Sequence, residues 1–165
     1  MPRAKSIKFP NTLTELEPLF DELQRILSNY ALNSGGLTIK QANSVKAKTV
    51  NDVYYIVDGQ LYKLAAGDMA DLSGTVSNGK YNVYVFTVNA NGDLATRMGT
   101  EAGTLGGVEF PTIPEGEVVI GFVIIHPTGT GNFVGGTTPL DDSTVVPNAV
   151  YVNTPLPFLP GISVL

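Results

Sequence analysis

His126 is the only histidine in the sequence, so any nucleophile activated by an imidazole would depend on it. The following loop carries two acids and two hydroxyl groups, which are Asp141, Asp142, Ser143 and Thr144. These are the residue types of a serine or threonine hydrolase, but the Gly-x-Ser-x-Gly turn that exposes a nucleophilic serine is absent. Because a single histidine at a strand end is more often a hydrogen-bonded structural residue, we expect no catalytic site here.

Carboxylates also occur in closely spaced pairs, which are Asp68 and Asp71, Glu115 and Glu117, and Asp141 and Asp142. Glycoside cleavage needs two carboxyl groups that face each other across a sugar at about 5 to 9 Å, and sequence neighbours on loops do not indicate this. Calcium binding at residues 68 and 71 would need an Asp-x-Asp-x-Asp-Gly loop with a distant glutamate, which is absent. The chain also has no cysteine. We therefore predict a protein without enzymatic activity, metal or cofactor.

A loop rich in glycine and threonine follows the most apolar run of the chain, residues 118–125. A phosphate site there would need a helix directly after the glycines, because free N–H groups at a helix start hold the phosphate. The segment Gly129-Thr-Gly131 continues into Asn132 and Phe133, so the third glycine of Gly-x-Gly-x-x-Gly is missing. These features favour a surface loop of an all-β protein over a nucleotide site.

Three segments stand out in the part of the chain from about Tyr54 to Val152: Phe110-Pro-Thr-Ile-Pro-Glu-Gly, Gly121-Phe-Val-Ile-Ile and Gly129-Thr-Gly-Asn-Phe-Val-Gly-Gly-Thr-Thr-Pro-Leu-Asp-Asp. Through these segments the chain resembles small structural proteins of tailed bacteriophages, of the head decoration or head-fibre type. The resemblance implies an accessory protein of the virion, made in the host cytoplasm and bound to the assembled capsid as a trimer. Its partners would be the major capsid protein or another virion protein. An alternative is a receptor- or carbohydrate-binding module of a tail fibre or tail tip, acting through exposed tyrosine and aspartate side chains.

Composition and charge indicate which other partners to expect. The 165 residues include 18 glycines and 11 prolines with only 15% charged residues, which is typical of turn-rich β structure. Residues 1–50 carry a net charge of +3 and residues 51–165 one of −8, so the basic arm at residues 1–12 either docks on an acidic partner or is simply solvated. Its cations Arg3, Lys5 and Lys8 are too sparse for a nucleic-acid site, so we regard them as candidate capsid contacts. We expect no secretory signal and no membrane span.

An amphipathic helix is predicted over residues 13–34. Its apolar positions alternate in steps of three and four, which is the spacing of a coiled-coil seam: Leu13, Leu16, Phe20, Leu23, Leu27 and Tyr30. An isolated helix of this length is marginal in water, so the stripe must pack on something. It either forms a short bundle with other copies of the chain, with residues 16, 20, 23, 27 and 30 as the contacts, or lies against its own sheet.

Residues 35–153 are predicted to form an antiparallel β-sandwich or barrel of seven or eight strands. Asp58-Gly59 and Asn91-Gly92 are hairpin turns between runs rich in β-branched and aromatic residues. The run 118–125 is expected to be a central strand covered on both faces, and residues 147–152 the last strand. Tyr54, Tyr55 and Tyr62 lie on the first hairpin, where we favour cross-strand packing over sugar stacking.

The last residues, 154–165, form a proline-rich apolar tail that cannot be a helix or a central strand. An extended apolar segment in water is unfavourable, so the tail is expected to lie in a groove of a neighbour, with a disordered terminus as the alternative. Phe158, Leu159 and Ile162 are its candidate capsid contacts.

Overall fold

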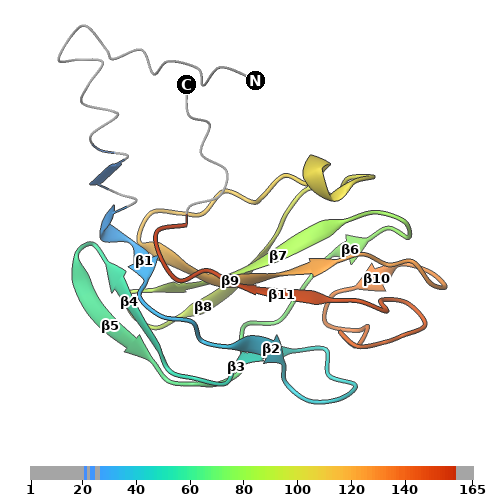
Figure 1. The fold of residues 1–165 in the computed structure, drawn as a ribbon, viewed down its shortest axis with the longest axis horizontal. Helices are drawn as coiled ribbons and strands as arrows, with labels where there is room; N and C mark the ends of the chain where they lie inside the picture. Colours follow the sequence, from blue (N-terminus) through green and yellow to red (C-terminus); the bar gives the residue numbers. More distant parts are fainter. Residues whose placement is uncertain (1–20, 22, 25–26, 159–165) are drawn as a thin grey trace, which may run out of the picture.

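The computed structural model describes residues 21, 23–24 and 27–158, and these form a mainly β protein with antiparallel sheets (Figure 1). The strands are β1 (Tyr30–Ala31), β2 (Leu37–Ile39), β3 (Ala47–Thr49), β4 (Val53–Val57), β5 (Gln60–Leu64), β6 (Thr75–Val76), β7 (Asn82–Asn89), β8 (Leu94–Met98), β9 (Glu117–Ile125), β10 (Phe133–Val134) and β11 (Val150–Asn153). One short 3₁₀ helix, η1, covers Leu105–Gly107. The mainly β, antiparallel character predicted from the sequence is confirmed.

A four-stranded sheet in the order β11-β9-β7-β8 forms the centre of the domain. Strands β7 and β9 pair along eight rungs, with a register shift between Phe86 and Thr87. Seven of the eight residues of β7 are buried, and β9 has buried positions on both of its faces. The prediction that the apolar run before His126 is a strand covered on both faces is therefore confirmed.

One face of this sheet packs against a three-stranded sheet in the order β1-β4-β5 (Figure 1). The core between the two sheets is built from aliphatic and aromatic side chains, among them Val53, Tyr55, Phe86, Ile120 and Val123. Tyr55 also stacks on Tyr62 across the β4–β5 hairpin, with ring centroids 5.6 Å apart. The structural interpretation of these two tyrosines is confirmed.

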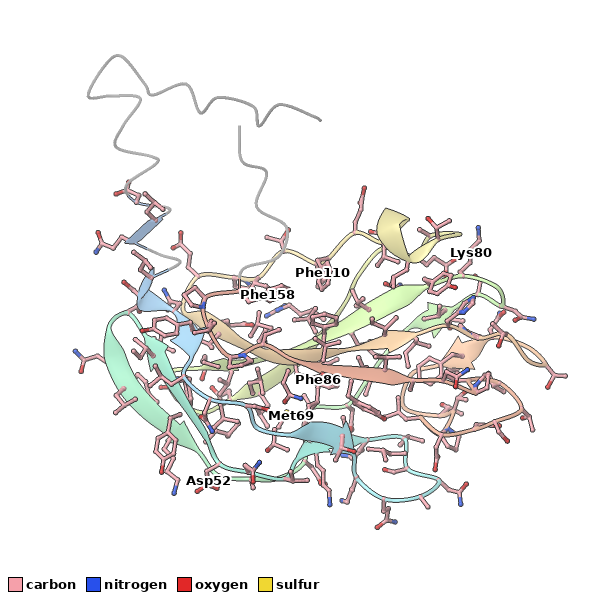
Figure 2. The ribbon with its side chains drawn as sticks, in the orientation of Figure 1. Asp52, Met69, Lys80, Phe86, Phe110 and Phe158 are labelled. Carbon is pink, nitrogen blue, oxygen red and sulfur yellow. The ribbon has the colours of Figure 1, made fainter. Side chains whose placement is uncertain are left out.

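The opposite face of the four-stranded sheet is covered by the long connection between β8 and β9 and by the start of the C-terminal tail. Val83, Val85 and Val119 pack there against Ile113. Figure 2 shows Phe110 and Phe158 on this side, while Phe86 and Met69 lie on the side of the main core. The central strands are therefore buried on both faces, one covered by a sheet and the other by loops.

Both predicted hairpin turns are present. Strands β4 and β5 pair around Asp58 and Gly59, which have φ angles of 49° and 76°. Two consecutive residues with positive φ define a turn whose twist matches that of the paired strands. Strands β7 and β8 pair around Asn91-Gly92, and Gly92 also has a positive φ of 83°.

The predicted helix over residues 13–34 is wrong at its C-terminal end. Residues 21, 23–24 and 27–28 are helical, but Tyr30 lies in β1 opposite Ile56 of β4. The β4–β5 turn ends the helix, because Gly59 donates its N–H to the Ser28 carbonyl and Asp58 donates its N–H to the Asn29 side chain. The β domain consequently begins at Tyr30, five residues earlier than predicted, and its last strand is Val150–Asn153.

Candidate functional site

His126 does not form a catalytic arrangement with the acids of the following loop. Its imidazole is stacked on the Tyr81 ring, with centroids 3.6 Å apart and planes 14° from parallel. Within the described part of the chain, no hydrogen bond joins His126 to Asp141 or Asp142. The ring is used in a surface stack beside the end of β9.

Asp141 and Asp142 instead hold the backbone of two loops in place. Both carboxylate oxygens of Asp141 accept the N–H of Asn43, at 3.1 and 3.0 Å. Asp142 accepts the hydroxyl and the N–H of Thr144, at 2.6 and 2.8 Å, and this lowers the pKa of the Asp142 carboxyl. Bonds to the charged form stabilise that form, so the Asp142 carboxyl is held as a carboxylate in a structural role.

In the other two acidic pairs, Asp68, Asp71 and Glu117 each form an ion pair with a different basic residue. Asp68 pairs with Lys40 and Asp71 with Lys46, so ion pairs link the loop between β2 and β3 to the segment that follows β5. Glu117 accepts bonds from Arg97 of β8 and from the hydroxyl of Thr87 of β7, and its side chain is only 17% exposed. In residues 21, 23–24 and 27–158, no group of three or more histidine or acidic residues is placed to hold a metal ion.

The glycine- and threonine-rich loop satisfies its own backbone rather than presenting it to a ligand. Thr130 donates its N–H to the Thr144 carbonyl at 2.7 Å, and Val134 donates its N–H to the Thr138 hydroxyl at 3.0 Å. Asn132 accepts the N–H of Asn78, which ties the loop to the turn before β7. These contacts favour the interpretation of this segment as a surface loop.

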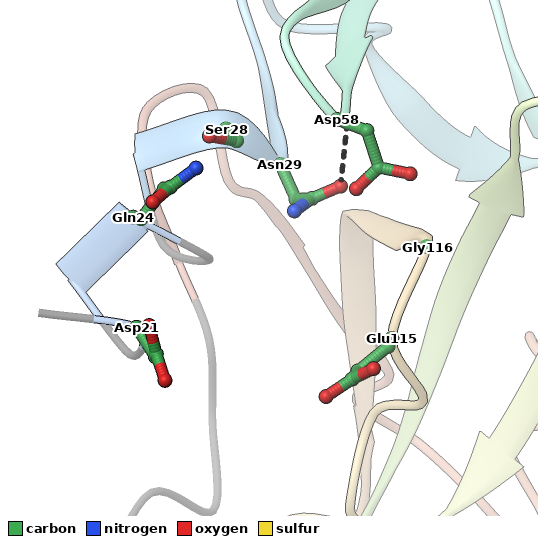
Figure 3. A pocket seen from close by; sticks show the side chains of 7 residues that line it. All are labelled: Asp21, Gln24, Ser28, Asn29, Asp58, Glu115 and Gly116. Atoms are coloured by element: carbon green, nitrogen blue, oxygen red, sulfur yellow. Dashed lines mark hydrogen bonds between the residues drawn. The ribbon is translucent and has the colours of Figure 1, made fainter. Parts of the chain in front are cut away.

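A polar pocket of about 340 Å³ lies between the end of the helical segment and the turn before β9 (Figure 3). Its lining consists of acids, amides, a serine and a glycine: Asp21, Gln24, Ser28, Asn29, Asp58, Glu115 and Gly116. Asn29 and Asp58 are already joined by a hydrogen bond. The seven lining residues include no aromatic ring on which a sugar could stack.

The outer face of the three-stranded sheet is apolar and was not singled out from the sequence. We define it by five side chains, which are Tyr30, Leu32, Tyr54, Ile56 and Leu61. Leu61 is 64% exposed, and Leu32 and Tyr54 are each more than 40% exposed. This face could not be predicted from the sequence of β5. Leu61 and Tyr62 are adjacent and both hydrophobic, so the pattern of apolar and polar residues does not tell which one points inward.

The residues predicted to mediate docking have different surroundings. Leu23 and Leu27 are 44% and 64% exposed on the helical segment, whereas Tyr30 is half-buried in β1. Phe158 is half-buried against Phe110 and Phe122 of its own domain, so its ring is already covered by the chain itself. The remaining candidates lie outside the described residues: Arg3, Lys5, Lys8, Leu16, Phe20, Leu159 and Ile162.

Comparisons with family models, with curated protein sequences and with solved structures find no match to this chain. Within residues 21, 23–24 and 27–158, no helix has the length and apolar character to cross a membrane. The exposed apolar side chains of the helical segment and of the outer face of the three-stranded sheet form the candidate site.

Proposed function

We propose that the chain is a non-enzymatic structural protein of a bacteriophage virion, of the head decoration or head-fibre type, which binds the assembled capsid as a trimer. The observation that carries the proposal is the exposure of Leu23 and Leu27. These two residues belong to a seam spaced in threes and fours, and their own β domain leaves them largely uncovered. An apolar seam in that position favours association with other chains.

The chemistry of the described residues supports a role without catalysis. Most of the titratable groups that the sequence offered as catalytic or metal-binding candidates are used in ion pairs, loop hydrogen bonds or stacking, as shown for His126, Asp142 and Glu117. A catalytic acid or base must reach a reacting group, and these groups are committed to neighbours in the fold. The resemblance of residues 54–152 to phage head proteins is the reason why we propose the phage head as the location of the protein.

The test is a pair of density maps of intact phage particles, one from the virus that encodes the chain and one from a virus from which its coding sequence has been removed. We expect difference density on the capsid surface, with three copies around each attachment point. Density on the tail, or no difference at all between the two particles, would contradict the proposal.

A second candidate function is a receptor- or carbohydrate-binding module, and the polar pocket is the observation that favours it. Amide and carboxylate groups such as those of Gln24, Asp58 and Glu115 can hydrogen-bond sugar hydroxyls. Binding on a glycan array that is lost in Glu115→Ala and retained in Glu109→Ala, an acid outside the pocket, would favour this function over decoration. A decoration protein is expected to bind no glycan, whether as the wild type or as either variant.

A further inference from the structure

We infer that the outer face of the three-stranded sheet packs against a second copy of this chain, so that the subunit interface extends from the helical segment onto β1, β4 and β5. The inference rests on the proposed function for its oligomer and adds the surface through which the β domains contact each other. The face consists of the five side chains defined above, and Leu61 is its most exposed member.

Strand pairing places these side chains on one surface in two adjoining rows. Tyr30 lies opposite Ile56, and Ile56 lies opposite Leu61, which makes a row across all three strands. In the next row Leu32 donates its N–H to the Tyr54 carbonyl, and Tyr54 lies opposite Lys63. The intervening residues Ala31 and Tyr55 are 1% exposed, so the two rows point away from the core.

The helical segment leads directly into this surface along the chain. Ser28 and Asn29 alone separate Leu27 from Tyr30, and the segment lies at the β1 end of the domain (Figure 1). Twenty residues precede Asp21, and they carry the earlier members of the seam at Leu13, Leu16 and Phe20. A seam of this length is marginal by itself, because short isolated helices are only weakly stable in water. A partner that covers the seam and the sheet face together provides the additional apolar contact.

Charge favours a second copy over a charged partner. One charged residue, Lys63, lies next to the five side chains that define the face, and its ammonium pairs with Asp52 at 2.7 Å and lies over the Tyr54 ring at 5.8 Å. The outer face is therefore close to neutral, whereas residues 51–165 as a whole carry −8. Copies with this net charge repel each other, and they approach at the lowest electrostatic cost through a neutral apolar face.

The decisive substitution is Leu61→Asp, with Leu105→Asp as the matched control. Leu105 is also an exposed leucine, 49% accessible, but it lies in η1 on the other side of the four-stranded sheet. Sedimentation equilibrium of the full chain gives the dissociation constant of the oligomer for each protein. We expect Leu61→Asp to weaken association by at least about tenfold and Leu105→Asp to leave it unchanged, because central interface residues dominate affinity.

A labelling experiment reports on the same face without a charge change. The chain contains no cysteine, so Leu61→Cys and Leu105→Cys each introduce a single thiol. We expect a maleimide to label the thiol at position 61 more slowly than that at position 105 at high protein concentration, and equally fast after dilution. Protection of position 61 that persists in the monomer would overturn the inference, since the face would then be covered by residues of the same chain.

Particle binding separates the inference from the proposed function. An oligomer that is unaffected by Leu61→Asp would overturn the inference alone, because its interface would lie elsewhere. A monomeric wild type that still binds phage capsids would also overturn the inference, while attachment to the capsid would stand. A monomeric wild type that does not bind capsids would overturn both the inference and the proposed function.

Discussion

Gly129 packs against the backbone of Thr144 so closely that a β-carbon built on it would lie 1.8 Å from the Thr144 carbonyl oxygen. Gly135 makes a similar approach to Ser73 in the loop before β6. A glycine in such a place is required by the neighbouring backbone, whatever the ligand chemistry of the loop. Gly129, the first glycine of the segment that suggested a phosphate cradle, is therefore a packing residue, whereas Gly131 has a positive φ of 96° and a β-carbon on it would meet no atom within 4 Å.

We predict that Gly129→Ala lowers the free energy of unfolding by about 1–3 kcal/mol, because the added methyl group overpacks a backbone contact that cannot move freely. Urea denaturation measures the change. Gly106→Ala is the control, since a β-carbon on Gly106 meets no atom within 4 Å. Equal stability of the two variants would mean that the loop relaxes around position 129.

We predict that Thr144→Val raises the pKa of Asp142 towards its ordinary value, because the Thr144 hydroxyl is the largest cause of the lowered pKa. Because the Asp142 pKa is lowered by folding, the carboxylate stabilises the fold at pH values above its ordinary pKa. This stabilisation is lost as the pH falls through the lowered pKa of the folded protein. The variant should therefore lose less stability on acidification. Carboxyl NMR titration gives the pKa, and Ser143→Ala should leave it unchanged.

At the scale of elements, the start of the tail closes the outer surface of the four-stranded sheet. Leu156 donates its N–H to the Ala31 carbonyl at 2.8 Å, and Phe158 then lies against two rings of its own domain. Phe110 contacts Phe122 edge-on, and Phe158 stacks on Phe122 with centroids 5.8 Å apart. The segment from Thr154 to Phe158 is thus part of the β domain, whereas the sequence assigned it to a separate tail.

We predict that Phe158→Ala lowers the free energy of unfolding by about 1–2 kcal/mol, less than the loss of a fully buried ring. Leu156→Ala, at a residue 69% exposed, should have little effect. A double-mutant cycle with Phe110→Ala should show a coupling energy of about 0.5–1.5 kcal/mol, as is usual for aromatic pairs. Denaturation at one fixed protein concentration measures the free energy of unfolding of Leu156→Ala and of the four proteins in the cycle. Strictly additive losses for Phe158→Ala and Phe110→Ala would contradict the contact between the two rings.

At the scale of the whole molecule, burial is greatest where β7 and β9 pair. The side chains of Val83, Tyr84, Val85 and Phe86 are at most 1% exposed, although they alternate between the two faces of the sheet. The three-stranded sheet has one face in the core and one apolar face towards the outside. This asymmetry separates the part of the domain that maintains the fold from the part that we propose to contact another copy.

We predict that the backbone amides of β7 and β9 exchange with deuterium more slowly than all others, because they open only when the whole domain unfolds. Amides of η1 and of the connection around it should exchange much faster. Hydrogen exchange followed by NMR tests this order. Slower exchange in the β4–β5 hairpin than in β7 and β9 would place the most stable unit in the wrong sheet.

The local signals in this sequence were enough to predict the hairpins and the central strand. The first hairpin turn has positive φ angles at Asp58 and Gly59 and the second at Gly92, and the run 118–125 is rich in β-branched residues, so these signals depend on neighbours in the chain. Three-dimensional packing decided the rest. The helix ends at Ser28 rather than at residue 34 because the acceptors at its end meet N–H donors of the β4–β5 turn, which no local pattern encodes. Likewise, only the pairing of β1, β4 and β5 brings Tyr30, Ile56 and Leu61 into one row, because a surface made from three separate strands exists only after they are in register.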